Sequence, residues 1–252
     1  MFIQDAIVHS NKLISENTYV IEVKAENLIK YVRPGNFFNI QVNNSDFPLL
    51  RRPFSICDVE GDSIFFMYKI VGEGTSILAE KKEGNKVNLL GPLGNGFGVE
   101  DNIDHLIMIG GGIGIAPFPF LIRKLRAGIT YKVLFGVRNR TEVHNYGLQN
   151  ISYSSDDGSV GFHGNVIELL DNYLKDNIQG NIKIIGCGPD PMLKALREYS
   201  INNNLSCDVS MESAMACGFG ICQGCPIEYN DGEAYKLICK DGPIFNVKEI
   251  MI

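Results

Sequence analysis

The segment HLIMIGGGIGIAP, residues 105–117, decides the fold. Its first part, HLIMIG (105–110), is an unbroken apolar run, which is typical of a strand buried on both faces, and such strands occur in parallel sheets covered by helices. Glycines follow directly, and the helical run PFPFLIRKLRAG comes next. A strand that passes through glycines into a helix is the repeating unit of an α/β sheet. The segment therefore predicts a parallel α/β domain.

The alternation of apolar strands and helices continues after this segment, whereas the residues before it show a different pattern. Apolar strands are expected at 131–137, 151–155 and 182–188, alternating with helical runs, so residues 101–206 predict a Rossmann-like parallel α/β domain. Upstream, short β-branched or aromatic runs between turn residues predict an antiparallel β-barrel over residues 1–100. Its strands are expected at 18–25, 37–42, 53–59 and 63–71, a short helix at 75–82, and a loop at 91–98.

The glycine turn after the central strand suits a nucleotide. Its glycines allow a pyrophosphate to approach backbone N–H groups and the positive end of the helix. It departs from the dinucleotide fingerprint G-x-G-x-x-G, because Pro117 stands at the third glycine and no acidic residue ends the next strand. The turn therefore predicts a nucleotide site, with a purely structural strand–helix turn as the alternative. Its residues are Gly110, Gly111, Gly112, Gly114 and Pro117.

Seven cysteines, an odd number, fit poorly with a disulfide framework. Four of them crowd into residues 217–252 of the C-terminal segment 207–252, where the order is C-x4-C-x2-C followed by a fourth cysteine. This is the plant-type [2Fe–2S] arrangement, whereas structural zinc sites usually show two tight cysteine pairs. The segment predicts a small [2Fe–2S] domain, with zinc or four unrelated thiols as alternatives. The expected ligands are Cys217, Cys222, Cys225 and Cys239.

Three shorter motifs carry weaker signals. RRPFS (51–55) places arginine at the start of a strand, which taken alone is better explained as an edge-strand charge. GEGT (72–75) is either a phosphate cradle or an ordinary helix cap with Thr75 at the N-cap. GCGPDPML (186–193) ends a strand and opens a helix, so Cys187 is either a core residue or part of the ligand edge of the sheet.

Composition excludes several classes of function. A net charge of −6 argues against nucleic acid or an anionic membrane as partner. No run of 18 apolar residues exists, and MFIQDAIVHSNK lacks a secretory signal, so a cytoplasmic protein is expected. The histidines stand at no metal-ligand spacing, and no nucleophile motif is present. The four histidines are His9, His105, His144 and His163.

The order of these motifs resembles that of the ferredoxin–NADP reductase superfamily over the whole chain. That family joins a flavin-binding β-barrel carrying R-x-[YF]-S to a nucleotide domain carrying G-x-G-x-x-P and a later C-G-P. The cysteine quartet, ending in ICKDGPIF (238–245), narrows the resemblance to the iron–sulfur electron-transfer subunits of class 1B dihydroorotate dehydrogenases. The resemblance implies FAD, a [2Fe–2S] cluster and NAD(H) as cofactors.

The resemblance also implies a role for each motif. Arg52 would pair with the FAD pyrophosphate, Phe54 would pack along the flavin, and Ser55 would lie near its N5 atom. Gly74 and Thr75 would lie under the FAD phosphates. The turn 110–117 would hold the NAD pyrophosphate, and 186–189 would lie near the nicotinamide. The implied cofactor-binding residues are Arg52, Pro53, Phe54, Ser55, Tyr68, Lys69, Ile70, Val71, Gly74, Thr75, Gly110, Gly111, Gly112, Gly114, Pro117, Gly186, Cys187, Gly188 and Pro189.

The implied mechanism converts electron pairs into single electrons. NADH gives two electrons together, a cluster accepts one at a time, and a flavin does both, so no catalytic acid–base residue is nominated. The implied acceptor is an FMN-containing dihydroorotate dehydrogenase catalytic subunit, in a heterotetramer of two plus two chains that serves pyrimidine (UMP) biosynthesis. We expect the face around Phe219, Ile221 and Gln223 to contact that subunit.

Two alternatives remain open from the sequence. One is the flavin subunit of a ferredoxin-dependent NADP reductase or sulfide dehydrogenase, in which Arg138 and Arg140 would accept the 2′-phosphate of NADP. The other is a non-enzymatic interaction module stapled by a metal. Comparing the rates at which NADH and NADPH reduce the bound flavin tests the first alternative. A colourless purified protein would indicate the second.

Overall fold

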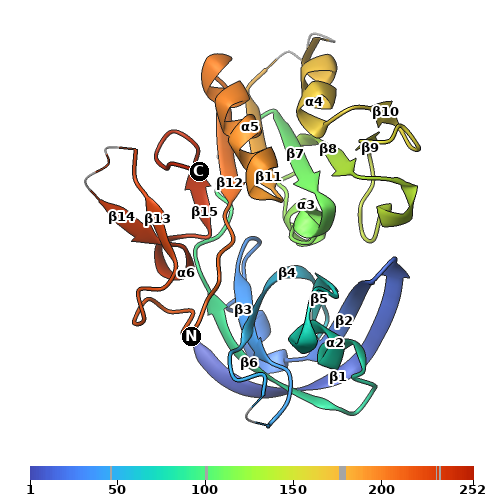
Figure 1. The fold of residues 1–252 in the computed structure, drawn as a ribbon, viewed down its shortest axis with the longest axis vertical. Coiled ribbons are helices and arrows are strands. Elements are labelled where there is room, and N and C mark those ends of the chain that lie inside the picture. Colours follow the sequence, from blue (N-terminus) through green and yellow to red (C-terminus); the bar gives the residue numbers. More distant parts are fainter. Residues whose placement is uncertain (46, 100–101, 176–179, 231, 233) are drawn as a thin grey trace.

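The computed structural model of the chain describes residues 1–45, 47–99, 102–175, 180–230, 232 and 234–252. In its N-terminal part, antiparallel strands close into a barrel in the order β1-β2-β5-β4-β3-β6 (Figure 1). Two short helices, α1 (Glu26–Ile29) and α2 (Glu73–Ala79), accompany the barrel. The predicted barrel is therefore confirmed. Its strands are β1 (Phe2–Ser15), β2 (Thr18–Lys24), β3 (Phe37–Gln41), β4 (Arg52–Glu60), β5 (Ser63–Lys69) and β6 (Lys86–Leu93).

Two barrel strands, β1 and β6, are not predicted by the sequence pattern. β1 buries few of its side chains, Ala6 and Val8 among them, so it lacks the apolar alternation that marks a strand. The loop predicted at 91–98 is wrong at its start, because Gly91 and Pro92 belong to β6. Gly91 fits in the strand because the ring of Phe38 fills the place of its missing side chain: a Cβ there would come within 2.3 Å of that ring.

The second part is a seven-stranded sheet in the order β10-β9-β8-β7-β11-β12-β15. All pairs are parallel except β12–β15, and β7 is buried from Leu106 onward, as its apolar run predicts. No helix in the described part of the chain is long and apolar enough to cross a bilayer. The elements are β7 (His105–Gly111), η1 (Gly112–Ile115), α3 (Phe118–Arg123), β8 (Thr130–Val137), η2 (Arg140–Glu142), β9 (Ile151–Ser155), β10 (Phe162–His163), α4 (Val166–Lys175), β11 (Ile182–Cys187), α5 (Asp190–Asn202) and β12 (Ser206–Ser210).

The C-terminal segment is joined to this sheet rather than separate from it. It contains the hairpin β13 (Pro226–Glu228) and β14 (Tyr235–Leu237), helix α6 (Ile238–Asp241), and β15 (Ile244–Asn246), which pairs with β12. Asp208 ties the strands together, because it accepts from Lys183 Nζ at 2.7 Å and from Asn246 Nδ2 at 3.1 Å.

The predicted domain boundaries need one correction. The boundary placed between residues 206 and 207 falls inside β12, because this strand is the parallel neighbour of β11 and runs from Ser206 to Ser210. The boundary placed between 100 and 101 lies outside the described residues.

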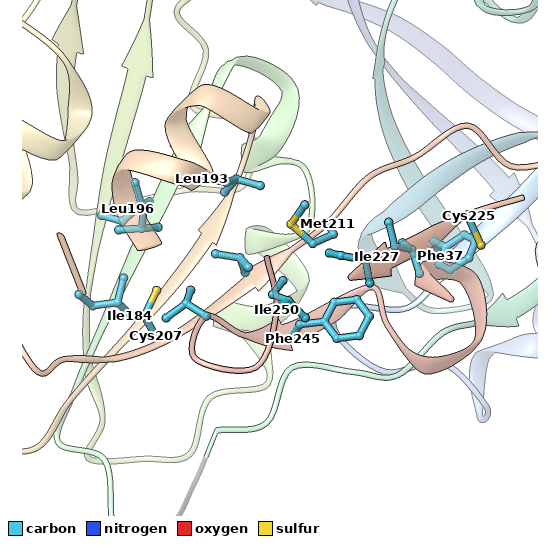
Figure 2. Close-up of a cluster of buried hydrophobic side chains, with 14 of the residues drawn as sticks. Phe37, Ile184, Leu193, Leu196, Cys207, Met211, Cys225, Ile227, Phe245 and Ile250 are labelled. Atoms are coloured by element: carbon cyan, nitrogen blue, oxygen red, sulfur yellow. The ribbon is translucent and has the colours of Figure 1, made fainter. Parts of the chain in front are cut away.

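One buried apolar cluster is shared by all three parts. Phe37 comes from the barrel, Ile184 and Leu193 from the sheet domain, and Cys225 and Ile227 from the C-terminal segment. Figure 2 shows Phe37 beside Cys225, with Met211 and Ile227 between them and the sheet side chains. Since apolar burial is the main stabilising contribution in folding, this cluster holds the three parts in one arrangement.

Candidate cofactor sites

The two glycine turns predicted to hold the nucleotide are in direct contact. A Cβ at Gly114 would come within 2.1 Å of the carbonyl oxygen of Cys187, and one at Gly188 would come within 3.0 Å of the amide nitrogen of Gly111. The turns follow the neighbouring parallel strands β7 and β11, so both lie at the carboxyl edge of the sheet. Ligands of open α/β sheets bind at this edge.

A cavity of about 910 Å³ opens in front of these turns. The barrel contributes Phe37, Pro53, Ser55 and Lys69, and the C-terminal segment contributes Met215 and Pro243. All three parts of the chain therefore bound one space, whose volume suits a ligand of nucleotide size. Of the residues predicted to bind cofactors, those in its lining are Pro53, Ser55, Lys69, Gly111, Gly112, Gly114, Gly188 and Pro189.

A second group of predicted residues gathers at the start of helix α2. The side chain of Arg52 lies against Gly74, where a Cβ would come within 2.3 Å of Arg52 Nε. The sequence pattern predicts Thr75 as the N-cap residue of this helix. This prediction is wrong, because helix α2 already begins at Glu73. Thr75 Oγ1 instead reaches back and accepts from the amide nitrogens of Val71 (2.9 Å) and Gly72 (3.1 Å). A guanidinium and the first turn of a helix thus stand together, which is an arrangement suited to phosphate.

The remaining predicted flavin residues lie in other surroundings. Tyr68 is buried inside the barrel, where its hydroxyl donates to Asn11 Oδ1 at 3.0 Å and burial raises the pKa of its phenol. Phe54 meets the ring of Tyr68 edge-on at 5.8 Å. Ile70 is half-buried, and Val71 is exposed. None of these four described side chains belongs to the cavity lining.

The other predicted residues of the nucleotide turns do not line the cavity. Gly110, Pro117 and Gly186 are buried, as is the thiol of Cys187, whose pKa is raised by burial. The structure therefore places the Cys187 side chain in the core and leaves its carbonyl group against Gly114.

An ion-pair network connects the barrel to the sheet domain beside the cavity. Lys69 Nζ of β5 lies 3.0 Å from Glu142 Oε1, and Glu142 also accepts from the side chain and backbone of Arg138. The guanidinium of Arg138 is the main cause that lowers the pKa of Glu142 to about 2. Arg140 donates to the carbonyl oxygen of Ser159 at 2.8 Å. Both arginines suggested for a 2′-phosphate are thus already engaged.

We expect Glu142→Gln to destabilise the chain by about 3 kcal/mol at pH 7, because the folded-state pKa of Glu142 lies well below its usual 4.5. A lowered carboxyl pKa stabilises the folded state fully above pH 4.5, and this contribution is lost as pH falls towards 2. Urea unfolding should therefore show the difference between variant and wild type shrinking to roughly half at pH 3. Glu198→Gln, on the exposed face of α5, is the matched control, and an equal difference at both pH values would contradict the prediction.

The cysteine loop turns its amide groups onto its own sulfurs. Gly218 and Gly220 have φ values of +80° and +90°, in the left-handed region that glycine adopts readily. As a result, the amides of Phe219 (3.5 Å) and Cys222 (3.4 Å) donate to Cys217 Sγ. Although burial opposes it, these donors lower the pKa of Cys217 to about 6. The loop thus stabilises a thiolate, the form that ligates iron.

The four sulfurs fall into two pairs. Cys217 interacts with Cys222, while Cys225 and Cys239 are both buried, with the Cys239 amide donating to Cys225 Sγ at 3.4 Å. Burial, followed by the neighbouring Cys225 thiol, raises the pKa of Cys239 to about 12. In the described part of the chain, no three Cys, His, Asp or Glu side chains converge on a single point. A [2Fe–2S] cluster needs two thiolates on each of two irons, so this donor set fits it.

Several residues around these sites are not predicted from the sequence. Phe37 and Met215 line the cavity, and Glu142 connects the two domains, but each stands in a stretch without any recognised motif. Asn39, buried next to Gly218, carries a weak signal, since it is a polar residue within the apolar run FFNIQV.

Comparison with known proteins agrees with this arrangement. Residues 212–251 match a family described as the iron–sulfur cluster binding domain of dihydroorotate dehydrogenase B. The chain is 37% identical to the dihydroorotate dehydrogenase B (NAD+) electron transfer subunit of Caldanaerobacter subterraneus subsp. tengcongensis, over 98% of this chain and 97% of that protein. It is 33% identical to the same subunit of Fusobacterium nucleatum, over the full length of both.

Two solved structures share the fold. A chain of an NADH-dependent reduced ferredoxin–NADP oxidoreductase superposes with a TM-score of 0.85, at 24% identity, over 98% of this chain and 89% of that one. A ferredoxin–NADP+ reductase from Neisseria gonorrhoeae with bound FAD and NADP gives 0.65, at 15% identity, over 79% of this chain and 91% of that one. With this fold and full-length relatives above 30% identity, the chain belongs to the family of electron transfer subunits of dihydroorotate dehydrogenase B (NAD+).

Proposed function

We propose that this chain passes electrons between NAD(H) and a partner subunit through FAD and a [2Fe–2S] cluster held by its own residues. The observation that carries the proposal is the position of Phe37. This side chain lines the cavity, and it also belongs to the buried cluster that contains Cys225 and Cys239. Phe37 therefore connects the cavity with the buried cluster that contains two of the proposed cluster ligands.

FAD binding is assigned to the barrel. Arg52 would face the pyrophosphate with its planar guanidinium, and the first turn of α2 at Gly74 and Thr75 would offer backbone N–H groups. Pro53, Ser55 and Lys69 would border the isoalloxazine from the cavity side. Lys69 forms an ion pair with Glu142 at 3.0 Å, which orients its side chain beside the cavity.

NAD(H) binding is assigned to the touching turns of the sheet domain. Gly111, Gly112 and Gly114 leave the backbone open to a pyrophosphate, and Gly188 and Pro189 border the same cavity. Met215, Pro243 and Phe37 give the cavity apolar walls. When bound, the flavin accepts an electron pair and releases single electrons. The protein's own residues bind and orient, and none is assigned a proton transfer.

The partner we propose is an FMN-containing dihydroorotate dehydrogenase catalytic subunit, in a cytoplasmic complex of two plus two chains. The exposed side of the cysteine loop supports a protein partner at this face, because Ile221 is 77% exposed and Phe219 is 36% exposed next to the proposed ligand Cys222. Apolar side chains exposed beside an electron-transfer site are suited to a protein interface.

The test is to separate the two subunits. The isolated chain is expected to reduce a dye with NADH and to leave dihydroorotate unchanged, while the complex couples dihydroorotate oxidation to NAD+ reduction. Ile221→Asp should reduce the coupled reaction and leave dye reduction intact, whereas Leu13→Asp, at an exposed leucine of β1, should change neither. Dihydroorotate oxidation by the isolated chain, or efficient NADP-linked ferredoxin reduction, would overturn the proposal.

A further inference from the structure

Asn39, in the middle of β3, has a buried side chain without a partner. The residue is fully buried, and in the described structure neither its Nδ2 nor its Oδ1 forms a hydrogen bond. Buried polar groups are nearly always paired, because leaving one unpaired costs about 1–3 kcal/mol. The unpaired amide therefore indicates a group that binds beside it.

The donor end of this amide lies against the cysteine loop. A Cβ at Gly218 would come within 2.1 Å of Asn39 Nδ2, so this nitrogen fills the side-chain space of the residue that follows Cys217. The Cys217 sulfur already accepts from two amides of its own loop. An N–H donor from the barrel thus stands next to the first ligand of the proposed cluster.

The strand that carries Asn39 also reaches the cavity. Phe37 and Asn39 lie on the same face of β3, opposite Ser55 and Pro53 of β4. Alternate residues of a strand are roughly 7 Å apart, and Phe37 lines the cavity. One face of β3 therefore extends from the cavity, at Phe37, to the cysteine loop, at Asn39. A substitution at Asn39 changes the end of this face that lies next to the cysteine loop.

We propose that Asn39 Nδ2 donates a hydrogen bond to a sulfur of the [2Fe–2S] cluster on its Cys217 side and thereby raises the reduction potential of the cluster. This inference rests on the proposed function, since it requires the cluster. Reduction adds negative charge to the cluster sulfurs, and an N–H dipole directed at them stabilises the reduced form more than the oxidised form. A higher potential makes the cluster a stronger electron acceptor, whether the electron comes from the partner subunit or from the flavin.

The test is an EPR-monitored redox titration of the full chain with its cofactors. Asn39→Leu removes the donor and nearly preserves the volume, so we expect about a tenfold lower ratio of reduced to oxidised cluster at a fixed potential, which is about 59 mV for one electron. The flavin potential in the same sample should stay unchanged. Gln41→Leu, on the same face of β3, is the matched control and should leave the cluster potential unchanged.

Two further measurements test the inference even if the Asn39→Leu variant folds poorly. Asn39→Asp keeps the shape, removes the donor and adds negative charge, so it should lower the cluster potential further than Asn39→Leu. In the wild type with ¹⁵N-labelled asparagine, hyperfine spectroscopy should detect a nitrogen coupling to the reduced cluster. An unchanged potential in both variants, or no such coupling, overturns the inference and leaves the proposed function standing. A wild type without iron overturns both.

Discussion

A chain carrying Cys225→Ala is expected to lose its cluster iron and keep its FAD. Cys225 is 2% exposed and is paired with Cys239, so its removal takes one thiolate from an iron that no outside ligand reaches. Iron should fall from about two atoms per chain to near zero, because [2Fe–2S] clusters need all four ligands. Reduction of the bound flavin by NADH should continue, while NAD-linked orotate formation in the complex should fall to background.

The matched control is Cys207→Ala. Cys207 is as buried as Cys225, but it lies on β12 outside the quartet. This variant should keep both iron and coupled activity at a small cost in stability, since only one buried sulfur atom is removed. Iron would be measured by elemental analysis, flavin by absorbance, and both reactions by stopped flow. If Cys225→Ala retained its iron, the cluster would be held by another set of residues.

The sequence was most informative where one local pattern has one structural solution. The apolar run at 105–110 is a strand of a parallel sheet, and the cysteine spacing brings four sulfurs into one segment. Both signals are local, because strand burial and loop curvature depend on neighbouring residues. The mixed polar and apolar pattern of β1 carries no such signal, since this strand is held by pairing with β2 and β6 rather than by burial.

The parts of the site that depend on distant contacts were not predictable. Glu142 matters because Lys69, 73 residues earlier in the chain, reaches it. Asn39 matters because Gly218 lies against it, and the 206/207 boundary falls inside β12 because this strand pairs with β11. Each of these contacts joins segments that are far apart in the sequence. Local propensity and residue spacing therefore do not predict them.

Gly74→Ala is expected to weaken FAD binding by about ten- to a hundredfold. The added Cβ would come within 2.3 Å of Arg52 Nε, so the guanidinium must leave its position on the first turn of α2. A charge-assisted hydrogen bond to phosphate contributes about 1.5–3 kcal/mol, which sets the size of the loss. FAD affinity would be measured by the quenching of flavin fluorescence when the deflavinated chain is titrated with FAD.

Gly72→Ala separates this displacement from a general effect on the helix start. Gly72 is the N-cap of α2, has an extended φ of 175°, and has no atom within 4 Å of an added Cβ, so FAD affinity should stay close to that of the wild type. A double-mutant cycle then isolates the cause. If Gly74→Ala acts by moving the guanidinium, it should add little in an Arg52→Ala background, because the group it displaces is already absent. Equal losses in both backgrounds would show that the phosphate contact does not run through Arg52.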